Sequence, residues 1–216
     1  MLHQIGWNLR EEERLLAPFK DCPNSFFFFF IMMNIIIWNC RGALKLSFQA
    51  NFRDLVANHD PIFFFVVMET RLGSEMAKEI MDKLPFQGVI HTDLVGFVGG
   101  LWFLWDSDRV EVTNLASTEQ EIHTVLKVNS FSLNWIFTIV YASSRDRERC
   151  ILWNNLNTVT NLHNLPWIIA DEFNELLSND EKLGGRPISL YRANLFKECL
   201  DSCNMADLGF NSPRFT

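Results

Sequence analysis

The sequence predicts an α/β layer fold, and three consecutive segments carry this prediction. "NIIIWN" (residues 34–39) and "PIFFFVVMETR" (61–71) are continuous apolar runs that end in polar residues, the pattern of strands buried on both faces of a sheet. The segment between them repeats apolar side chains at helical spacing and stops at a proline: Leu46, Phe48, Phe52, Leu55 and Val56. A strand, a helix and a strand in this order are typical of a sheet with both faces covered.

The rest of the chain extends this pattern. "GGLWFLWDSDRVEVTNL", "EIHTVLKVNS" and "SLNWIFTIVYASS" predict short strands at close spacing, as in antiparallel hairpins. "GGLWFLW" carries large apolar side chains on both faces, which indicates a fully buried strand rather than a platform for stacking bases. Residues 145–166 alternate polar and apolar side chains at helical spacing. "PWIIADEFNELL" (166–177) then predicts one more buried strand.

Composition limits the classes of protein that fit. A chain of 216 residues with 48% hydrophobic content can bury a substantial core, so it is not a disordered tail. A formal charge of −7 argues against nucleic-acid binding through a general basic surface, although a local basic strip is allowed. The five cysteines form no CxxC pair and stand near no histidine at ligand spacing, so we expect no zinc site: Cys22, Cys40, Cys150, Cys199 and Cys203. Their odd number, with no secretory leader expected, predicts reduced thiols inside the cell.

The N-terminal segment differs from the rest of the chain. Residues 26–38 are strongly apolar, but Asn34 interrupts them and the run falls short of the roughly 20 residues needed to cross a bilayer. We therefore expect no membrane anchor. Five consecutive phenylalanines have neither a strand period nor a helix period. We predict an unrelated low-complexity extension over residues 1–32 and a folded domain over residues 33–216.

Polar side chains stand where four of the predicted buried strands end. In open α/β sheets, ligands bind beyond this edge. An amide, carboxylates and a phenol, without clustered His or Cys, suit a hard cation such as Mg²⁺ with a phosphate held against it. The alternative is that strands simply end in polar residues because loops are solvated. The residues concerned are Asn39, Glu69, Tyr141, Asp171, Glu172 and Asn174.

Seven blocks of the chain resemble the endonuclease/exonuclease/phosphatase family in family order, and most closely the apurinic-like endonuclease domain of plant LINE-type, non-LTR retrotransposons. The blocks are "MNIIIWNCRGA", "METR", "GGLWFLW", "VYASS", "PWIIADEFNELL", "EKLGGRP" and "DLGFNSPRFT". The resemblance covers residues 33–216. It implies a four-layer α/β/β/α sandwich, here incomplete at the C-terminus, that hydrolyses phosphate esters with Mg²⁺ or Mn²⁺.

The resemblance also implies roles for individual residues. Asn39 and Glu69 would sit at the metal, with Glu69 as the carboxylate ligand. Tyr141 would lie against the scissile phosphate. In the family's Gly-Asp-Phe-Asn block the aspartate orients the attacking water and the asparagine steadies the phosphate. Glu172 stands in place of that aspartate, and Asn174 matches the asparagine.

Two departures from the family pattern bear on activity. Glu172 is one methylene longer than aspartate, a shift of roughly 1.5 Å, and displacements of about 1 Å in an active site can cost about 100-fold in rate. Asp171 replaces the glycine and adds a second negative charge beside the first. The family also ends in a Ser-Asp-His block whose histidine and aspartate are catalytic, and we expect this chain to lack it.

Three functions therefore stay open. The first is a metal-dependent endonuclease that nicks DNA. The second is a non-catalytic, truncated retrotransposon remnant, and the third is a phosphatase of the same fold. The resemblance implies DNA as the partner and allows a nuclear location. Arg145 and Arg147 could touch a DNA backbone, or could open a solvated helix with Asp146 and Glu148 as partners.

Overall fold

A computed structural model describes residues 2–4, 34–59, 62–95, 98–129, 134–181 and 184–205. The expected domain boundary between residues 32 and 33 lies outside these ranges. The last of the resembling blocks, residues 207–216, also lies outside them. Within them the chain forms two main sheets and two pairs of helices.

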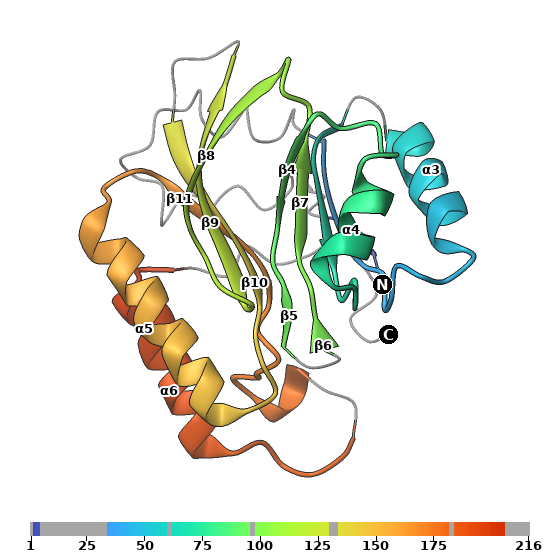
Figure 1. Ribbon diagram of the computed structural model, residues 1–216. Helices are drawn as coiled ribbons and strands as arrows, with labels where there is room; N and C mark the ends of the chain where they lie inside the picture. Colours follow the sequence, from blue (N-terminus) through green and yellow to red (C-terminus); the bar gives the residue numbers. More distant parts are fainter. Residues whose placement is uncertain are drawn as a thin grey trace.

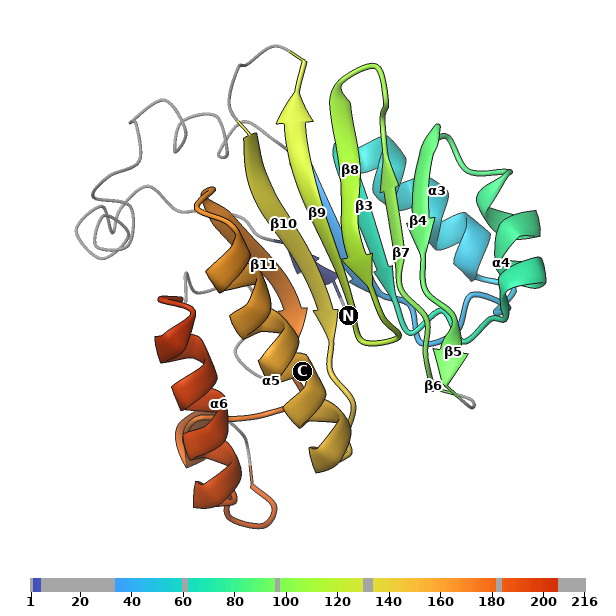
Figure 2. The same ribbon diagram turned by 60° about the vertical axis from the view of Figure 1, so that its left-hand side comes forward.

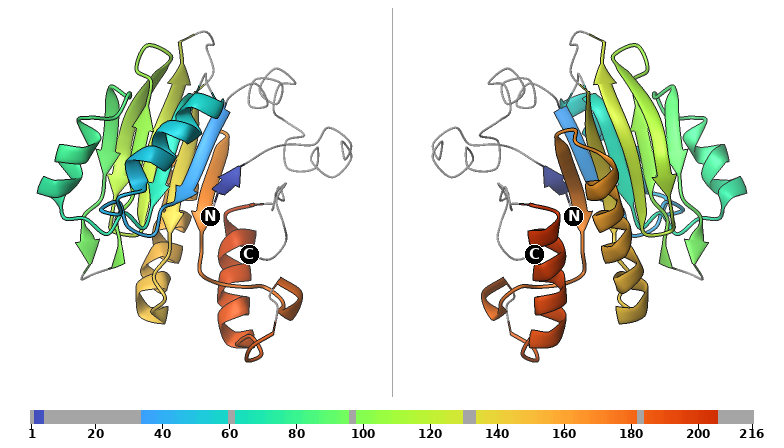
Figure 3. Two further views of the ribbon diagram at one scale, coloured as in Figure 1. Left: turned by 90° about the vertical axis from the view of Figure 1, so that its right-hand side faces the viewer. Right: turned by 90° about the vertical axis from the view of Figure 1, so that its left-hand side faces the viewer.

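The first sheet has five strands and combines parallel with antiparallel pairing. Its order is β1 (Leu2–Gln4), β2 (Asn34–Asn39), β3 (Ile62–Met68), β7 (Trp102–Trp105) and β4 (Gly88–His91). β2 and β3 run parallel, with Asn39 opposite Met68. β1 pairs antiparallel with β2, so three residues of the expected extension lie at the edge of this sheet (Figure 3).

The second sheet has four strands. Its order is β11 (Trp167–Glu172), β10 (Asn134–Tyr141), β9 (Glu121–Val128) and β8 (Val110–Ser117). β10 and β11 run parallel, with Tyr141 opposite Glu172, and the other neighbours are antiparallel. A small hairpin of β5 (Leu94–Val95) and β6 (Val98–Gly99) stands apart from both sheets.

Helices cover the outer face of each sheet, which completes four layers (Figures 1 and 2). α3 (Phe48–His59) and α4 (Ser74–Met81) lie on the first sheet, and α5 (Asp146–Leu162) and α6 (Leu190–Ser202) lie on the second. A 3-10 turn, η1 (Asn179–Glu181), lies between β11 and α6. The α/β/β/α sandwich expected from the sequence is therefore confirmed.

The alternation of side chains along each strand separates three hydrophobic cores. Ile35 and Ile37 of β2 face the second sheet, where they join Phe137 and Ile168, whereas Ile36 faces α3 and α4. The third core lies between the second sheet and the helices α5 and α6. Because successive strand residues point to opposite faces, the continuous apolar runs feed two cores at once.

The predicted elements match the observed ones where the apolar pattern is strong. α3 buries Phe48, Phe52 and Leu55, one face at helical spacing. The expectation was wrong for Leu46, which precedes the helix and is exposed. β7 buries large side chains on both faces, as expected from "GGLWFLW". In α6, the hydroxyl of Ser189 accepts a hydrogen bond from the Arg192 amide and caps the helix. Of the helices in the described ranges, none combines the length and the apolar character that a bilayer span requires.

Candidate active site

Four polar side chains meet at one place because four strands end there. Asn39 is the last residue of β2 and Glu69 follows the last residue of β3. Tyr141 and Glu172 are the last residues of β10 and β11, and they stand opposite one another in the parallel ladder. The first sheet thus supplies two of the four residues and the second sheet supplies the other two.

The amide of Asn39 joins the two sheets. Its Nδ2 donates to Oε1 of Glu69 at 2.9 Å and to Oε2 of Glu172 at 2.7 Å. Its Oδ1 accepts from the backbone N–H of Arg41 at 3.2 Å, which fixes the amide's orientation. Asn39 is 5% exposed and Glu69 is 9% exposed, so these contacts lie at the buried floor of the site. Two carboxylates from different sheets are therefore held around one amide.

The phenol of Tyr141 belongs to the same cluster. Its hydroxyl hydrogen-bonds to the Glu69 carboxylate. Burial of the ring, this hydrogen bond, and the charges of Glu69 and Glu172 all raise the pKa of Tyr141 well above its ordinary value, and the charge of Arg71 opposes them only in part. The phenol therefore stays protonated at neutral pH, where it can donate a hydrogen bond to an anionic group.

The carboxylate of Glu69 is ionised despite its burial. Burial by itself raises the pKa of Glu69. Hydrogen bonds from Asn39 and Tyr141, together with the hydrogen bond and charge of Arg71, outweigh it and lower the pKa below the ordinary value. The Arg71 guanidinium lies 2.5 Å from Oε2 of Glu69 and is half exposed. A carboxylate kept ionised in this way is suited to bind a cation.

The backbone around the cluster adopts an unusual conformation. In the described part of the chain, five residues other than glycine have positive φ, and four of them lie within three residues of the ends of β2, β3 and β11: Arg41, Glu69, Arg71 and Asn174, with φ from 51° to 55°. The left-handed region costs a residue with a side chain about 1–2 kcal/mol. Residues in such conformations concentrate at functional sites. This backbone signal is independent of side-chain chemistry and marks the same place.

The strand alternation separates the two adjacent carboxylates, Asp171 and Glu172. Glu172 faces Asn39, whereas Asp171 is exposed. The side chain of Asn174 lies beside the cluster: its Nδ2 donates to the carbonyl of Ala142 at 2.7 Å, directly after Tyr141. The structure thus brings Asn39, Glu69, Tyr141 and Glu172 together, and places Asn174 at the rim of the site.

Arg145 and Arg147 lie just beyond Tyr141, at the start of α5. Both are exposed. Arg145 contacts the Glu148 carboxylate at 2.9 Å, which matches the expectation of a helix opening with internal charge pairing. Arg147 lines a shallow cavity between α5 and α6. Neither side chain has a contact with Asn39, Glu69, Tyr141 or Glu172 among those the structure gives, and their role in binding DNA stays a prediction.

The donor atoms fit a hard divalent cation. Glu69 and Glu172 offer carboxylate oxygens, the ligand type that Mg²⁺ and Mn²⁺ prefer. The Asn39 amide turns its Nδ2 to these carboxylates and its Oδ1 to the Arg41 N–H, so its oxygen would join a cation only after the amide rotates. Within the described ranges, no group of three or more His, Cys, Asp and Glu side chains is arranged to hold a metal. A cation at this site would therefore need the amide, water or phosphate oxygens in addition to the two carboxylates.

The contacts reveal two features that the sequence did not single out. Arg71 pairs with Glu69, and it stands two residues later in the same block, "METR". Gly100 lies against the turn after β3: its carbonyl accepts from the Thr70 N–H at 3.2 Å, and a Cβ there would come within 2.3 Å of the Thr70 hydroxyl. The paired glycines at the start of "GGLWFLW" were the available signal for this close approach.

No model of a known protein family matches the sequence, and no curated protein matches it. Solved structures do match the fold. An AP endonuclease from Leishmania major is 14% identical, with a TM-score of 0.58 over 79% of this chain and 66% of that one. The endonuclease domain of TRAS1, a telomere-specific non-LTR retrotransposon, is 14% identical, with a TM-score of 0.54 over 78% of this chain and 69% of that one.

A third structure, a 3′ phosphatase from Neisseria bound to a product DNA hairpin, is 15% identical, with a TM-score of 0.51 over 78% of this chain and 70% of that one. This chain thus spans about two thirds of the length of each of the three proteins. At identities this low, the TM-scores establish a shared fold, and the activity has to be tested. The chain has the four-layer fold of the endonuclease/exonuclease/phosphatase proteins.

Proposed function

We propose that the site is built for metal-dependent hydrolysis of phosphodiester bonds in DNA, as in a nicking endonuclease. The observation that carries this proposal is the Asn39 amide, which holds one carboxylate from each sheet at 2.9 and 2.7 Å. Strand ends from two sheets converge on hard oxygen ligands and a neutral phenol. This combination suits a cation and a phosphate bound side by side.

Each residue then has a task. A bound Mg²⁺ or Mn²⁺ would polarise a phosphoryl oxygen and stabilise charge that develops on it. Glu69 and Asn39 would hold the cation. Tyr141, kept protonated by its surroundings, would donate a hydrogen bond to the phosphate. Glu172 would orient the attacking water, and Asn174 at the rim would steady the phosphate.

DNA is the substrate that the proteins of similar structure favour. Two of the proteins with similar structures are endonucleases, and the third structure holds a DNA product. Origin in a plant LINE-type retrotransposon, and with it a nuclear location, rests on the sequence blocks and belongs to the proposal. Arg145 and Arg147 would contact the DNA backbone from the start of α5.

Two other functions have specific support. Glu172 is one methylene longer than the aspartate of the family block, which favours a scaffold without turnover. The Neisseria structure is described as a 3′ phosphatase, which supports a phosphatase that removes terminal phosphate groups.

Nicking of supercoiled plasmid with Mg²⁺ or Mn²⁺ tests the proposal. We expect cation-dependent open circles from the wild-type chain and a loss of about 100-fold or more in the Asn39→Ala, Glu69→Ala double variant. Glu111→Gln is the matched control, because it removes an exposed carboxylate that pairs with Lys127 on the second sheet. Release of phosphate from a 3′-phosphorylated hairpin, without nicking, would favour the phosphatase instead.

Restoring the family block separates slow turnover from none. The Asp171→Gly, Glu172→Asp double variant shortens the carboxylate and removes the adjacent charge. If the misplaced Glu172 limits the rate, this variant should nick about 100-fold faster than the wild-type chain. The absence of nicking in both proteins, while both still bind Mn²⁺, would contradict the proposed activity and favour the inactive scaffold.

A further inference from the structure

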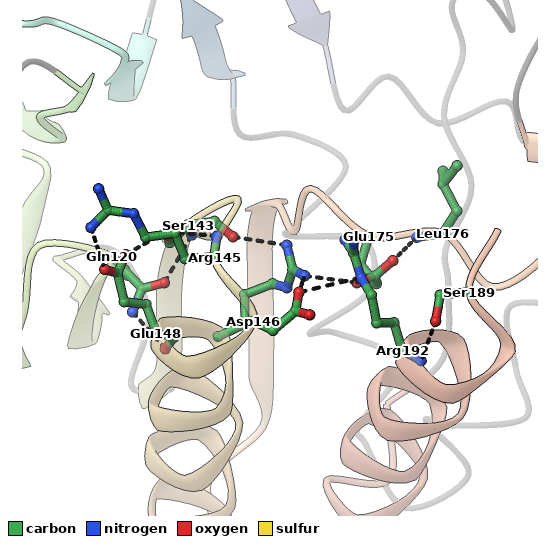
Figure 4. Close-up of polar contacts among 10 residues, drawn as sticks. Gln120, Ser143, Arg145, Asp146, Glu148, Glu175, Leu176, Ser189 and Arg192 are labelled. Atoms are coloured by element: carbon green, nitrogen blue, oxygen red, sulfur yellow. Dashed lines mark hydrogen bonds and ion pairs between the residues drawn. The ribbon is translucent and has the colours of Figure 1, made fainter. Parts of the chain in front are cut away.

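A group of four charged side chains lies next to the candidate active site, between the first turns of α5 and α6 (Figure 4). We call it the α5–α6 charge cluster. It consists of Asp146, Arg149, Glu175 and Arg192. Nothing in the function proposed above uses it, although one member directly follows Asn174 in the chain.

Arg149 is the buried centre of the cluster. It is 2% exposed. One guanidinium nitrogen donates to the carbonyl of Ser143 at 3.0 Å. The other contacts the Asp146 carboxylate, and lies 3.3 Å from Oε2 of Glu175. One guanidinium thus reaches both the loop that leaves β10 and the loop that leaves β11.

Glu175 is the buried carboxylate of the cluster. Its side chain is 8% exposed. Oε2 accepts from Nε of Arg192 on α6 at 2.8 Å and faces Arg149 on α5. Oε1 accepts from the backbone N–H of Leu176 at 3.3 Å. A buried charge is tolerated only when it is paired, so Glu175 has to remain between the two helices.

The two loops that the cluster joins both begin at site residues. Ser143 comes two residues after Tyr141, and Glu175 comes three residues after Glu172. The Asn174 side chain also spans these loops, through its hydrogen bond to the Ala142 carbonyl. Because the sheet already holds Glu172 opposite Tyr141, a change in the position of Glu175 would move Asn174 relative to Tyr141.

The packing around Glu175 leaves room for such a movement. A cavity of about 200 Å³ lies directly beside the cluster, and Arg147, Cys150 and Tyr191 also line it. Phe173, the first residue of the loop, packs against Trp153 and Phe196, with ring centroids 5.6 and 4.8 Å apart. Beyond Phe173, charged contacts next to an open space, rather than close apolar packing, hold the loop.

We propose that Glu175 is a positioning residue: through Arg149 and Arg192 it fixes the loop that carries Asn174 in the place beside Tyr141 that the site requires. This inference deepens the proposed function and rests on it for its effect on catalysis. Its structural half, the fixing of the loop, can be tested without any activity.

The test compares Glu175→Gln with the wild-type chain by hydrogen–deuterium exchange and by steady-state nicking. Loss of the charge should make amide exchange in the peptide of residues 172–178 about tenfold faster, because two guanidinium contacts weaken. Exchange in peptides from β2 and β3 should stay unchanged. The kcat for nicking should fall about 100-fold with KM changed little, because the loop acts on the reacting groups rather than on DNA binding.

Asp201→Asn is the matched control. It removes a carboxylate of the same helix layer, but one whose pair with Lys197 is exposed, 62% and 63% for the two side chains. This variant should match the wild-type chain in both exchange and kcat. Glu175→Asp keeps the charge on a shorter side chain and should recover part of the loss of protection. If Glu175→Gln does not fold, Arg192→Gln carries the same test, since it removes the outer partner of Glu175, along with the 3.5 Å contact to Asp146, and leaves Arg149 in place.

Wild-type exchange in residues 172–178 of a folded variant would overturn the inference, as would faster exchange spread evenly over both sheets. The two proposals fail differently. Local loss of protection in Glu175→Gln together with an inactive wild-type chain would uphold the positioning contact and reject the proposed hydrolysis. Active wild-type protein with an unchanged kcat in Glu175→Gln would uphold the hydrolysis and reject the positioning role.

Discussion

The two outer layers of the sandwich are attached to their sheets in different ways. α3 packs through aromatic rings: Trp38 stacks on Phe48 at 5.1 Å, and Phe52 stacks on Phe65 at 4.5 Å. α5 packs on the second sheet through Leu152, Trp153 and Leu156, and it adds buried polar contacts that α3 lacks among those the structure gives. Asn155 contacts the buried carboxylate of Glu121 at 2.5 Å, and the amide of Gln120 donates to the carbonyl of Glu148 at 2.9 Å.

This difference predicts which sheet loses more stability when a single polar side chain is substituted. Apolar contacts are non-directional and indifferent to ionisation, so the aromatic layer should hold the first sheet steady across pH and salt. Buried polar groups are expensive when one partner is lost. The second sheet supplies Tyr141 and Glu172. Its stability and the geometry of the site therefore depend on the same buried polar contacts.

The largest expected effect lies in the aromatic layer. Phe52 is 1% exposed, and Phe52→Ala should lower the free energy of unfolding by about 3–5 kcal/mol through lost burial and an internal cavity. Urea denaturation measures this, and the loss should be the same at low and high salt. Leu46→Ala, at a fully exposed position, should stay within about 0.5 kcal/mol of the wild-type chain.

The next effect is in the polar layer. Glu121 is 1% exposed, and its carboxylate meets Asn155 and lies 3.3 Å from Nε2 of the buried His123. Glu121→Ala removes the carboxylate from the half-buried Asn155 and from Nε2 of His123, which keeps only its Nδ1 contact with Thr138, and should cost about 3 kcal/mol. Glu111→Ala removes a carboxylate from an exposed pair and should cost less than about 1 kcal/mol. Equal losses in the two variants would contradict the large contribution assigned to the buried polar contacts.

A smaller loss of stability is expected at glycines with positive φ, and its effect on Mn²⁺ binding depends on whether the glycine lies beside the site. Gly100→Ala places a Cβ within 2.3 Å of the Thr70 hydroxyl at φ +84°, next to Glu69, so it should weaken Mn²⁺ binding and cost about 1–3 kcal/mol of stability. Gly184→Ala has φ +70° and nothing within 4 Å, so it should carry backbone strain alone and leave Mn²⁺ affinity intact. Calorimetric titration with Mn²⁺ distinguishes the two variants.

The smallest effect is a pH dependence at the start of α5. Hydrogen bonds from Ser143 and Arg145 lower the pKa of Glu148 below its ordinary value. A carboxyl with a depressed folded-state pKa stabilises the fold above its unfolded pKa and loses that contribution as the pH falls through the folded value. The stability difference between the wild-type chain and Glu148→Gln should be constant above about pH 5 and shrink below it. An unchanged difference at pH 3 would contradict this account.

Much of the fold was predictable because its strands are apolar on both faces. The runs at residues 34–39 and 62–68 have no competing interpretation as surface segments, and the strand period places Glu172 and Asp171 on opposite sides. α4 and β4 gave weaker signals. α4 is short and buries only Ala77 and Met81, and in β4 only Gly88 is fully buried. Neither pattern rises above that of a loop.

The site was predictable only in part. Its four strand ends could be found because each is a polar residue that closes an apolar run. The contacts that hold them could not, since Thr70 with Gly100, and Arg149 with Glu175, meet through tertiary structure and leave no period in the sequence. The charged residues near α5 therefore predicted only a solvated helix start, whereas Arg149 is buried.

The central claim is that strand ends from both sheets form one cation site. A crystal grown with Mn²⁺ and measured at a wavelength where manganese scatters anomalously tests it directly. The account predicts one strong peak within about 2.5 Å of a Glu69 carboxylate oxygen, beside Asn39 and Glu172, and no such peak in the Asn39→Ala, Glu69→Ala variant. Manganese bound only at other carboxylates, with the four strand ends bare, would contradict it.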